Sequence, residues 1–200
     1  MPRLAPLALA LTAVVSLALH AHEPHDHAHG SHNAAAHQHG VGTLDIVIDG
    51  QQLLLELSTP AADLLGFEHA PHNQTQRDQL DSLMNTLRQP EKLFALPAAA
   101  QCSLDSAELH SPLFALHEHS SDDAHAQHEH HHGHDDEHQH EHADITAQYS
   151  YSCITPTRLE HLDVTLFDLF PGSEKLILQA ITPQGQQGGE LTVTDRRVRF

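Results

Sequence analysis

Residues 44–58 read L-D-I-V-I-D-G-Q-Q-L-L-L-E-L-S. Large aliphatic residues stand at every second position from Leu44 to Ile48, which is the pattern of a β-strand with one buried face. Asp49-Gly50 is a tight-turn signal, and residues 52–58 return as a second strand. The stretch therefore predicts a β-hairpin.

After the hairpin, the hydrophobic period changes to that of a helix. Four apolar residues lie at i, i+3, i+4 and i+7, namely Leu80, Leu83, Met84 and Leu87. They predict one amphipathic helix over residues 73–89, which Pro90 prevents from continuing. We expect a loop over residues 61–71 and a short helical turn within residues 90–96.

The rest of the chain reads as further strands. Residues 102–109 and 145–153 flank a long polar insertion, and the second of these segments alternates cleanly between apolar and polar residues. Three more strands are expected over residues 162–170, 174–182 and 190–200, separated by Pro171-Gly172 and by a turn-rich segment at 183–189. The predicted fold class is α+β: a mainly antiparallel β-sheet with one amphipathic helix, in a single domain spanning residues 41–200.

The insertion, residues 117–142, reads H-E-H-S-S-D-D-A-H-A-Q-H-E-H-H-H-G-H-D-D-E-H-Q-H-E-H. Eleven of its 26 residues are histidine and eight are Asp or Glu, and no large apolar residue occurs. Such a segment cannot bury enough apolar surface to offset the entropy of ordering its backbone, so we expect it to be disordered. Imidazole and carboxylate groups are ligands for Zn and its neighbours, and a solvated acidic linker would not need this many histidines. The candidate metal ligands here are His117, His119, His125, His128, His130, His131, His132, His134, His138, His140 and His142.

The amino terminus reads as an export signal. Arg3 is followed by an apolar run over residues 4–19 and by small residues at Ala18 and Ala21, so we expect removal of residues 1–21. The alternative is a membrane anchor, but the run is short for a span and no basic stop follows it. Residues 22–40 form a second, flexible histidine-rich segment, which contains His22, His25, His27, His29, His32, His37 and His39.

The net charge of the chain limits the classes of partner that the protein can bind. The chain has 9 Lys and Arg against 27 Asp and Glu, a formal net charge of −18 with neutral histidines. So acidic a protein repels nucleic acid and anionic lipid and attracts cations. We therefore expect no nucleic-acid partner, and no stable membrane insertion once the signal is removed.

Cys102 and Cys153 are the two cysteines. In an exported protein they predict a disulfide, which would bracket the insertion and hold its two roots together. The alternative, a pair of thiolate metal ligands, is disfavoured by an oxidising compartment and by the absence of a C-x-x-C pair.

Several segments resemble a known family. They are H-Q-H-G at 37–40, P-A-A-D-L-L-G-F-E-H-A-P at 60–71, L-F-A-L-P at 93–97 and L-F-D-L-F-P-G at 166–172, together with the hairpin and the paired cysteines around the insertion. These segments are similar to the periplasmic zinc-uptake proteins of the ZrgA type. The resemblance implies a soluble periplasmic protein that binds Zn²⁺ and works alongside an ABC-type importer. The resemblance also implies functional roles for His39 and His69, which have His37 and His72 as neighbours.

A physical argument also favours an ordered site. His39 stands just before the first strand and His69 follows the second, and a hairpin brings its outer ends together. The two imidazoles are expected to converge, with His37, His72, Asp63 or Glu68 completing the shell. The alternative is that His69 hydrogen-bonds a carbonyl beside Pro71 as a structural loop residue.

These observations predict two-tier capture of Zn²⁺. Flexible tracts take up the ion quickly, an ordered site holds one ion more tightly, and affinity falls as the pH drops through the histidine range near ~6.5. The alternative function is an envelope buffer for Zn, Cu or Ni without a transporter partner. We expect no enzyme, because a catalytic zinc needs three fixed ligands, an open position and a nearby acid or base, and Glu68-His69 is too common a pair to indicate hydrolysis.

Overall fold

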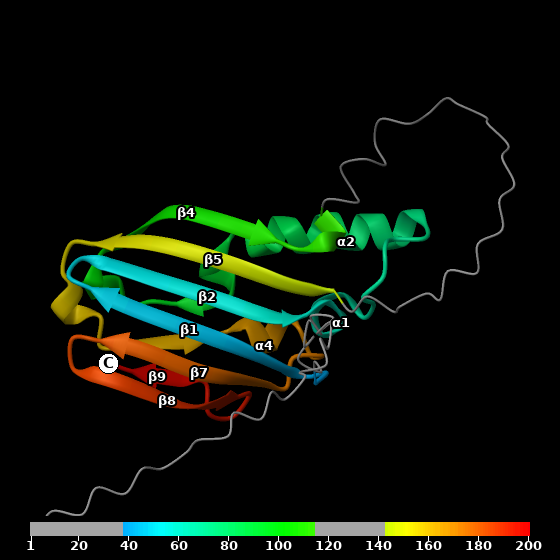
Figure 1. Cartoon of the computed structure of the whole chain (residues 1–200). Helices are drawn as coiled ribbons and strands as arrows, with labels where there is room; N and C mark the ends of the chain where they lie inside the picture. The colour runs from blue at the N-terminus through cyan, green and yellow to red at the C-terminus, as the bar shows by residue number, and fades with distance from the viewer. Residues whose placement is uncertain (1–37, 115–142) are drawn as a thin grey trace, which may run out of the picture. The chain divides into compact units, whose positions relative to one another are not determined.

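The predicted hairpin lies at the centre of a six-stranded sheet (Figure 1). The structure is a computed structural model that describes residues 38–114 and 143–200. β1 (Val41–Asp49) and β2 (Gln52–Pro60) pair antiparallel, with Leu44 opposite Leu57 and Ile46 opposite Leu55. Gly50 has a φ of 59°, the left-handed conformation that the tight turn needs. The hairpin prediction is confirmed.

Four more strands complete this sheet in the order β4-β5-β2-β1-β7-β8. They are β4 (Cys102–His110), β5 (Asp144–Cys153), β7 (Lys175–Thr182) and β8 (Gly185–Thr192). All neighbours pair antiparallel except β1 and β7, which are parallel. The α+β class with a largely antiparallel sheet is confirmed, and the parallel pair makes the sheet mixed.

A smaller sheet and several helical segments lie against one face of the large sheet. The small sheet has the order β3-β6-β9, from β3 (Phe94–Ala95), β6 (His161–Val164) and β9 (Arg197–Arg199). The helices are α1 (Ala61–Leu65), α2 (Gln74–Leu87) and α4 (Leu166–Leu169), with 3-10 turns at η1 (Pro90–Lys92), η2 (Ala98–Ala100) and η3 (Pro156–Arg158). Figure 1 shows α2, α4 and β9 behind the large sheet.

The predicted amphipathic helix is α2. Its N-cap, Asn73, accepts a hydrogen bond from the Gln76 backbone N–H, which satisfies one of the free amides of the first turn. Its apolar stripe faces the core, with Leu80, Leu83 and Leu87 buried. The short turn expected after Pro90 is η1.

The core forms between α2, the small sheet and the inward face of the large sheet. It consists mainly of aliphatic side chains from alternate strand positions. Tyr149 is its largest fully buried residue; its hydroxyl donates to the Leu87 carbonyl at 2.8 Å, and its ring meets Phe94 edge-on. Burial raises the pKa of the Tyr149 hydroxyl, so this group stays a hydrogen-bond donor.

Three local predictions were wrong. The strand expected over 162–170 ends at Val164 and is followed by α4, because the adjacent residues Leu166 and Phe167 are both buried, which an alternating strand does not allow. The turn-rich segment at 183–189 is mostly strand β8, so the strand expected over 190–200 is divided between the end of β8 and β9. The loop at 61–71 begins with α1, which ends at Gly66 in the left-handed conformation.

No helix within the described ranges is long and apolar enough to cross a bilayer.

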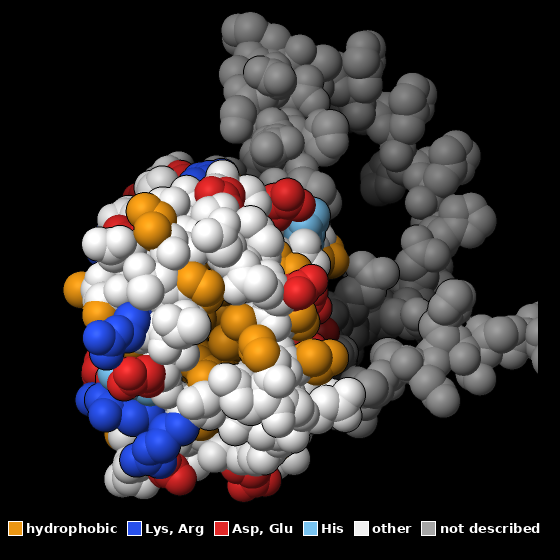
Figure 2. Space-filling model, turned by 90° about the vertical axis from the view of Figure 1, so that its left-hand side faces the viewer, with side chains coloured by type: hydrophobic (Ala, Val, Ile, Leu, Met, Phe, Trp, Pro, Cys, Tyr) orange, Lys and Arg blue, Asp and Glu red, His pale blue; other side chains and the backbone are white. Residues whose placement is uncertain are grey.

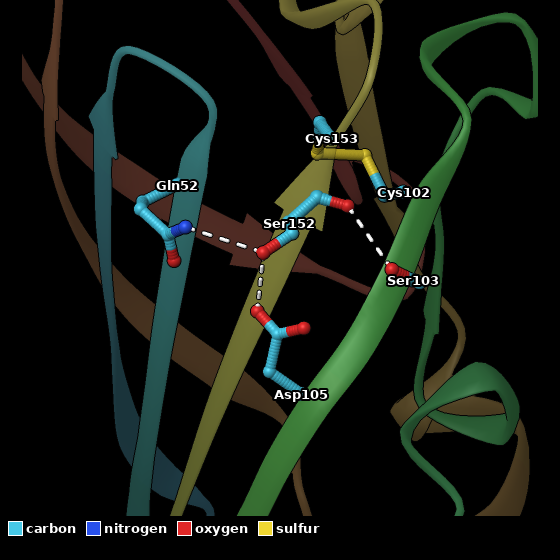
Figure 3. The surroundings of a disulfide bond; sticks show 6 residues. All are labelled: Gln52, Cys102, Ser103, Asp105, Ser152 and Cys153. Atoms are coloured by element: carbon cyan, nitrogen blue, oxygen red, sulfur yellow. Dashed lines mark hydrogen bonds between the residues drawn. A yellow bond between two sulfur atoms is a disulfide. The ribbon is translucent and has the colours of Figure 1, made fainter.

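The predicted disulfide between Cys102 and Cys153 is present. It closes the end of the β4–β5 ladder where β4 begins and β5 finishes (Figure 3). Beside it, Ser152 of β5 accepts a hydrogen bond from the Gln52 side chain and donates one to Asp105. These polar contacts link three neighbouring strands at the disulfide end.

The insertion leaves from the opposite end of the same two strands. His110, the last residue of β4, pairs with Thr146, and residues 111–114 and 143 lead into and out of the insertion. Three buried residues anchor these roots, namely Leu113, Phe114 and Ala143. The expectation that the disulfide holds the roots together was therefore wrong: strand pairing and buried anchors do so.

Candidate functional site

Three of the histidines predicted as metal ligands lie in the described ranges: His39, His69 and His72. The others fall outside those ranges: His37 and the eleven histidines of the insertion, which are His117, His119, His125, His128, His130, His131, His132, His134, His138, His140 and His142. The described part of the candidate site thus consists of these three histidines and the residues that position them.

The backbone beside His39 is held from two sides. The Gly40 N–H donates to Oδ1 of Asp63 at 2.8 Å, and the Gly40 carbonyl accepts from the amides of Glu174 and Lys175 at 2.9 and 2.8 Å. Gly40 has a φ of 80°, and a Cβ there would lie 3.1 Å from the Glu174 side chain. Glycine is thus favoured next to His39, and the turn that carries this histidine is fixed between α1 and β7.

Asp63 is the centre of this arrangement. Its side chain is 3% exposed, and it accepts from the Gly40 amide and from the Thr59 hydroxyl. Gly172 packs so closely on the Asp63 backbone that a Cβ there would lie 2.5 Å from the Asp63 carbonyl oxygen. Three segments that are far apart in sequence therefore meet around one buried carboxylate.

The His39 ring points its Nδ1 toward acidic groups. Nδ1 lies 3.5 Å from Oε1 of Glu68 and 4.0 Å from Oδ1 of Asp63, while the side chain is 61% exposed. Histidines that bind metal commonly direct their second ring nitrogen toward a carboxylate or a carbonyl, which orients the ring and increases its basicity as a ligand. With Nδ1 facing carboxylates, Nε2 of His39 is the nitrogen suited to a cation from solvent.

The His69 ring is oriented in the same way: its Nδ1 also faces a hydrogen-bond acceptor, here a backbone carbonyl. Its Nδ1 lies 2.8 Å from the Ala70 carbonyl oxygen, and because a carbonyl only accepts, Nδ1 carries the proton. In the neutral ring Nε2 then keeps its lone pair. The hydrogen bond to a carbonyl beside Pro71 is thus present, and the same bond leaves the other nitrogen suited to metal.

His69 also stacks between two rings. Its centroid lies 5.3 Å from that of Phe67, which is buried, and 4.1 Å from that of His72. The His72 backbone N–H donates to the Gln76 side chain at the start of α2. Phe67 and α2 therefore fix a pair of parallel imidazoles on the surface.

Glu68 connects the two histidine groups along the chain. This residue faces His39 and directly precedes His69 in the chain. Within residues 38–114 and 143–200, however, no three His, Cys, Asp or Glu side chains are grouped so as to hold a metal ion. The described residues thus provide one imidazole beside two carboxylates and, in the segment that follows Glu68, a pair of stacked imidazoles, and these do not form a closed shell around one ion.

One exposed histidine was missed by the sequence argument. His110, at the end of β4 where the insertion begins, has Nε2 3.9 Å from a Glu108 carboxylate oxygen. The sequence could have shown this pair, because residues i and i+2 of a strand share a face.

A further pattern lies outside the described ranges: residues 128–132 formally match H-E-x-x-H. That spacing indicates a metalloprotease only on a helix, and in so histidine-rich a tract it arises from composition.

The comparison with protein families gives one match. The model described as ZrgA family zinc uptake protein matches residues 36–200, which include the hairpin, all the ordered histidines and the insertion. A search of curated proteins gives no match.

Proposed function

Because the chain belongs to the ZrgA family of zinc uptake proteins, we propose that it captures Zn²⁺ outside the cytoplasm and supports its import by an ABC-type transporter. The family is a zinc-uptake family and not an enzyme family. Zn²⁺ is the cargo in this proposal, and histidine supplies most of the ligands.

The observation that carries the proposal is the orientation of the ordered imidazoles. His39 directs Nδ1 toward Glu68 and Asp63, and His69 donates from Nδ1 to the Ala70 carbonyl. Both side chains are exposed, Nε2 is the proposed ligand atom in each, and the group that faces Nδ1 is of the kind that supports zinc-binding histidines. His72, stacked on His69, supplies a further imidazole.

The histidine-rich segments supply the second tier of capture. Residues 22–40 and 117–142 offer many interchangeable sets of imidazole and carboxylate ligands, so that an arriving ion finds a partner in many conformations. Each such complex is weakened by the entropy of ordering the chain. Preoriented histidines avoid part of this cost and therefore hold zinc more tightly.

The two tiers of capture correspond to a proposed division of the chain into segments. Residues 1–21 are an export signal, residues 22–40 a histidine-rich capture segment, and residues 41–200 one domain interrupted by the insertion. The disulfide supports a location in the periplasm, since disulfides persist in oxidising compartments. The transporter partner is taken from the resemblance to the family.

Zinc titration calorimetry on residues 22–200 tests the ordered site. We expect His39→Ala and His69→Ala each to remove or weaken the tightest binding event, and His72→Ala to weaken it less. The matched control is His161→Ala: this ring faces Asp163, which Arg197 already pairs, so zinc binding should not change. An unaltered high-affinity isotherm in both His39→Ala and His69→Ala would reject the ordered site.

A second candidate function is a metal buffer of the envelope. It is favoured by the fact that 18 of the 23 histidines belong to the two tracts, seven in residues 22–40 and eleven in residues 117–142. Such tracts are poorly selective, and Cu binds histidine ligands more tightly than Zn does. Growth separates the two functions: loss of an importer component impairs growth under chelation, whereas loss of a buffer impairs growth under metal overload.

A further inference from the structure

The outer face of the six-stranded sheet has no covering layer in the described part of the chain. Inward residues of β1, β2, β5 and β7 are buried, whereas alternate residues of the same strands are partly or fully exposed. α2 and the small sheet lie on the inward side only (Figure 1). The strand register gives the outward residues of these strands that are neighbours on this face.

Carboxylates and amides form one row across this face. The register places five side chains side by side on β4, β5, β2, β1 and β7, in the order Glu108, Gln148, Glu56, Asp45 and Gln179. Gln148 donates to Glu56 at 2.8 Å, but Asp45 lies directly opposite Glu56 on the neighbouring strand. Like charges in directly opposite positions of an antiparallel pair are destabilising.

This repulsion has no compensating cation in the described residues. Lys175, the one described Lys or Arg on the outward positions of these strands, pairs with Glu190 at 2.9 Å. Oδ1 of Asp45 is buried and has no hydrogen-bond partner. Burial and the neighbouring Glu56 both raise the pKa of Asp45, the first effect being the larger. The middle of the face therefore keeps a negative pair that a cation from outside would stabilise.

An apolar row runs beside the acidic one. The register places Leu54, Val47 and Ile181 next to each other on β2, β1 and β7, and Leu54 and Ile181 are 46% and 52% exposed. Two shallow hollows of about 370 and 470 Å³ lie on either side of Asp45 and Val47, one toward β4 and the other toward β8. Figure 2 shows hydrophobic side chains exposed at the β1–β2 turn end of the molecule, with Lys and Arg gathered along a separate flank.

We propose that the outer face docks a segment of another protein that presents Lys or Arg beside apolar side chains. The cation would lie between Asp45 and Glu56, and the apolar side chains would cover Val47, Leu54 and Ile181. Neither nucleic acid nor an anionic membrane meets a face whose charge is negative. A metal ion alone would leave the apolar row uncovered, and a second copy would bring carboxylates against carboxylates.

The test uses residues 22–200 and a synthetic peptide that alternates lysine and leucine. Binding is followed by NMR chemical-shift changes, with a glutamate–leucine peptide and zinc alone as comparison probes. We expect the lysine–leucine peptide to shift the amide signals of β1, β2 and β7 around Asp45, Val47 and Leu54, with affinity that falls as salt is added. The other two probes should leave these signals in place.

Two variants and a matched control give the decisive readout. Asp45→Asn/Glu56→Gln removes the repulsion, so it should raise the midpoint of thermal unfolding. The same double variant should bind the lysine–leucine peptide about five-fold more weakly, or weaker still. Leu54→Ser should also lower the affinity for the peptide, but without the gain in stability. The control, Asp78→Asn/Glu91→Gln, removes two exposed charges away from this face and should change neither quantity.

Three results would overturn the proposal: peptide shifts confined to other residues, equal affinity in the double variant and its control, or zinc shifting the same signals. The last result would make the face a metal site. Because the readout is peptide binding and stability, it is independent of whether His39 and His69 bind zinc.

Discussion

The backbone amide of Gly40 donates a 2.8 Å hydrogen bond to the buried carboxylate of Asp63, 23 residues further along the chain. This contact fixes the residue that follows His39 to the helix that follows the central hairpin. Since Glu68 and His69 come shortly after that helix, the same carboxylate sets the distance between the two parts of the candidate zinc site.

Replacing Asp63 with Ala should weaken both the fold and the first zinc-binding event. The change leaves the Gly40 N–H and the Thr59 hydroxyl without their acceptor, and an unsatisfied buried polar group costs about 1–3 kcal/mol. Urea unfolding measures the loss of stability and calorimetry the loss of zinc affinity. Asp78→Ala, on the exposed face of α2, is the control and should change neither by much. Full zinc affinity in a destabilised Asp63→Ala protein would show that this carboxylate does not position the site.

Removing the disulfide should reduce stability without releasing the insertion. Cys102 and Cys153 are 51 residues apart, and closing a loop of that size contributes roughly 4 kcal/mol in the loop-entropy account. The roots of the insertion lie at the opposite end of β4 and β5, so a Cys102→Ser/Cys153→Ser protein should bind the same number of zinc ions. Thermal unfolding and zinc titration measure the two effects. A fall in stoichiometry in a protein that is still folded would contradict the placement of the roots.

Asp163 should make the small sheet sensitive to acid. Arg197 donates two hydrogen bonds to its carboxylate, at 2.6 and 2.7 Å, and these lower the pKa of Asp163 below the usual value near 3.9. A carboxyl group with a lowered folded-state pKa contributes stability above its unfolded pKa, and this contribution is lost as the pH falls through the folded value. Asp163→Asn should therefore be less stable than the wild type at pH ~7 and equally stable below that pKa. Denaturant unfolding across this range checks the sign, and a difference that persists in strong acid would contradict it.

Replacing residues 117–142 with a short Gly-Ser linker should lower zinc stoichiometry and leave the fold intact. β4 and β5 stay paired through their own register and the anchors Phe114 and Ala143, so circular dichroism should not change. Calorimetry should show fewer zinc ions but keep the tightest event. A deletion protein that unfolds, or one with unchanged stoichiometry, would count against a capture role for the insertion.

The elements that the sequence predicted well are those with a strong local period. The alternation from Leu44 and the helical stripe from Leu80 each encode one buried face, and both elements formed as expected. β8 could not be found this way, because its Gly and Gln side chains are exposed and its stability comes from backbone pairing with β7. The parallel pairing of β7 with β1 could not be predicted either, because the alternation of apolar and polar residues is the same in parallel and antiparallel strands.

The candidate site shows the same limit. Histidine content and the order of the hairpin led to His39, His69 and the acidic residues near them. The partners of each ring nitrogen depend on contacts between distant segments, such as Gly40 with Asp63, and no local pattern encodes these contacts. The position of the disulfide was within reach, however: Cys102 begins one strand and Cys153 ends its antiparallel neighbour, so the two must lie away from the connecting insertion.

The most direct measurement is the metal content of the mature protein purified at neutral pH from the cells that make it, with neither chelator nor added metal. If histidine-based capture of Zn²⁺ is the function, elemental analysis will find zinc as the main transition metal, at more than one ion per chain. A protein that retains neither zinc nor any neighbouring transition metal would contradict the account.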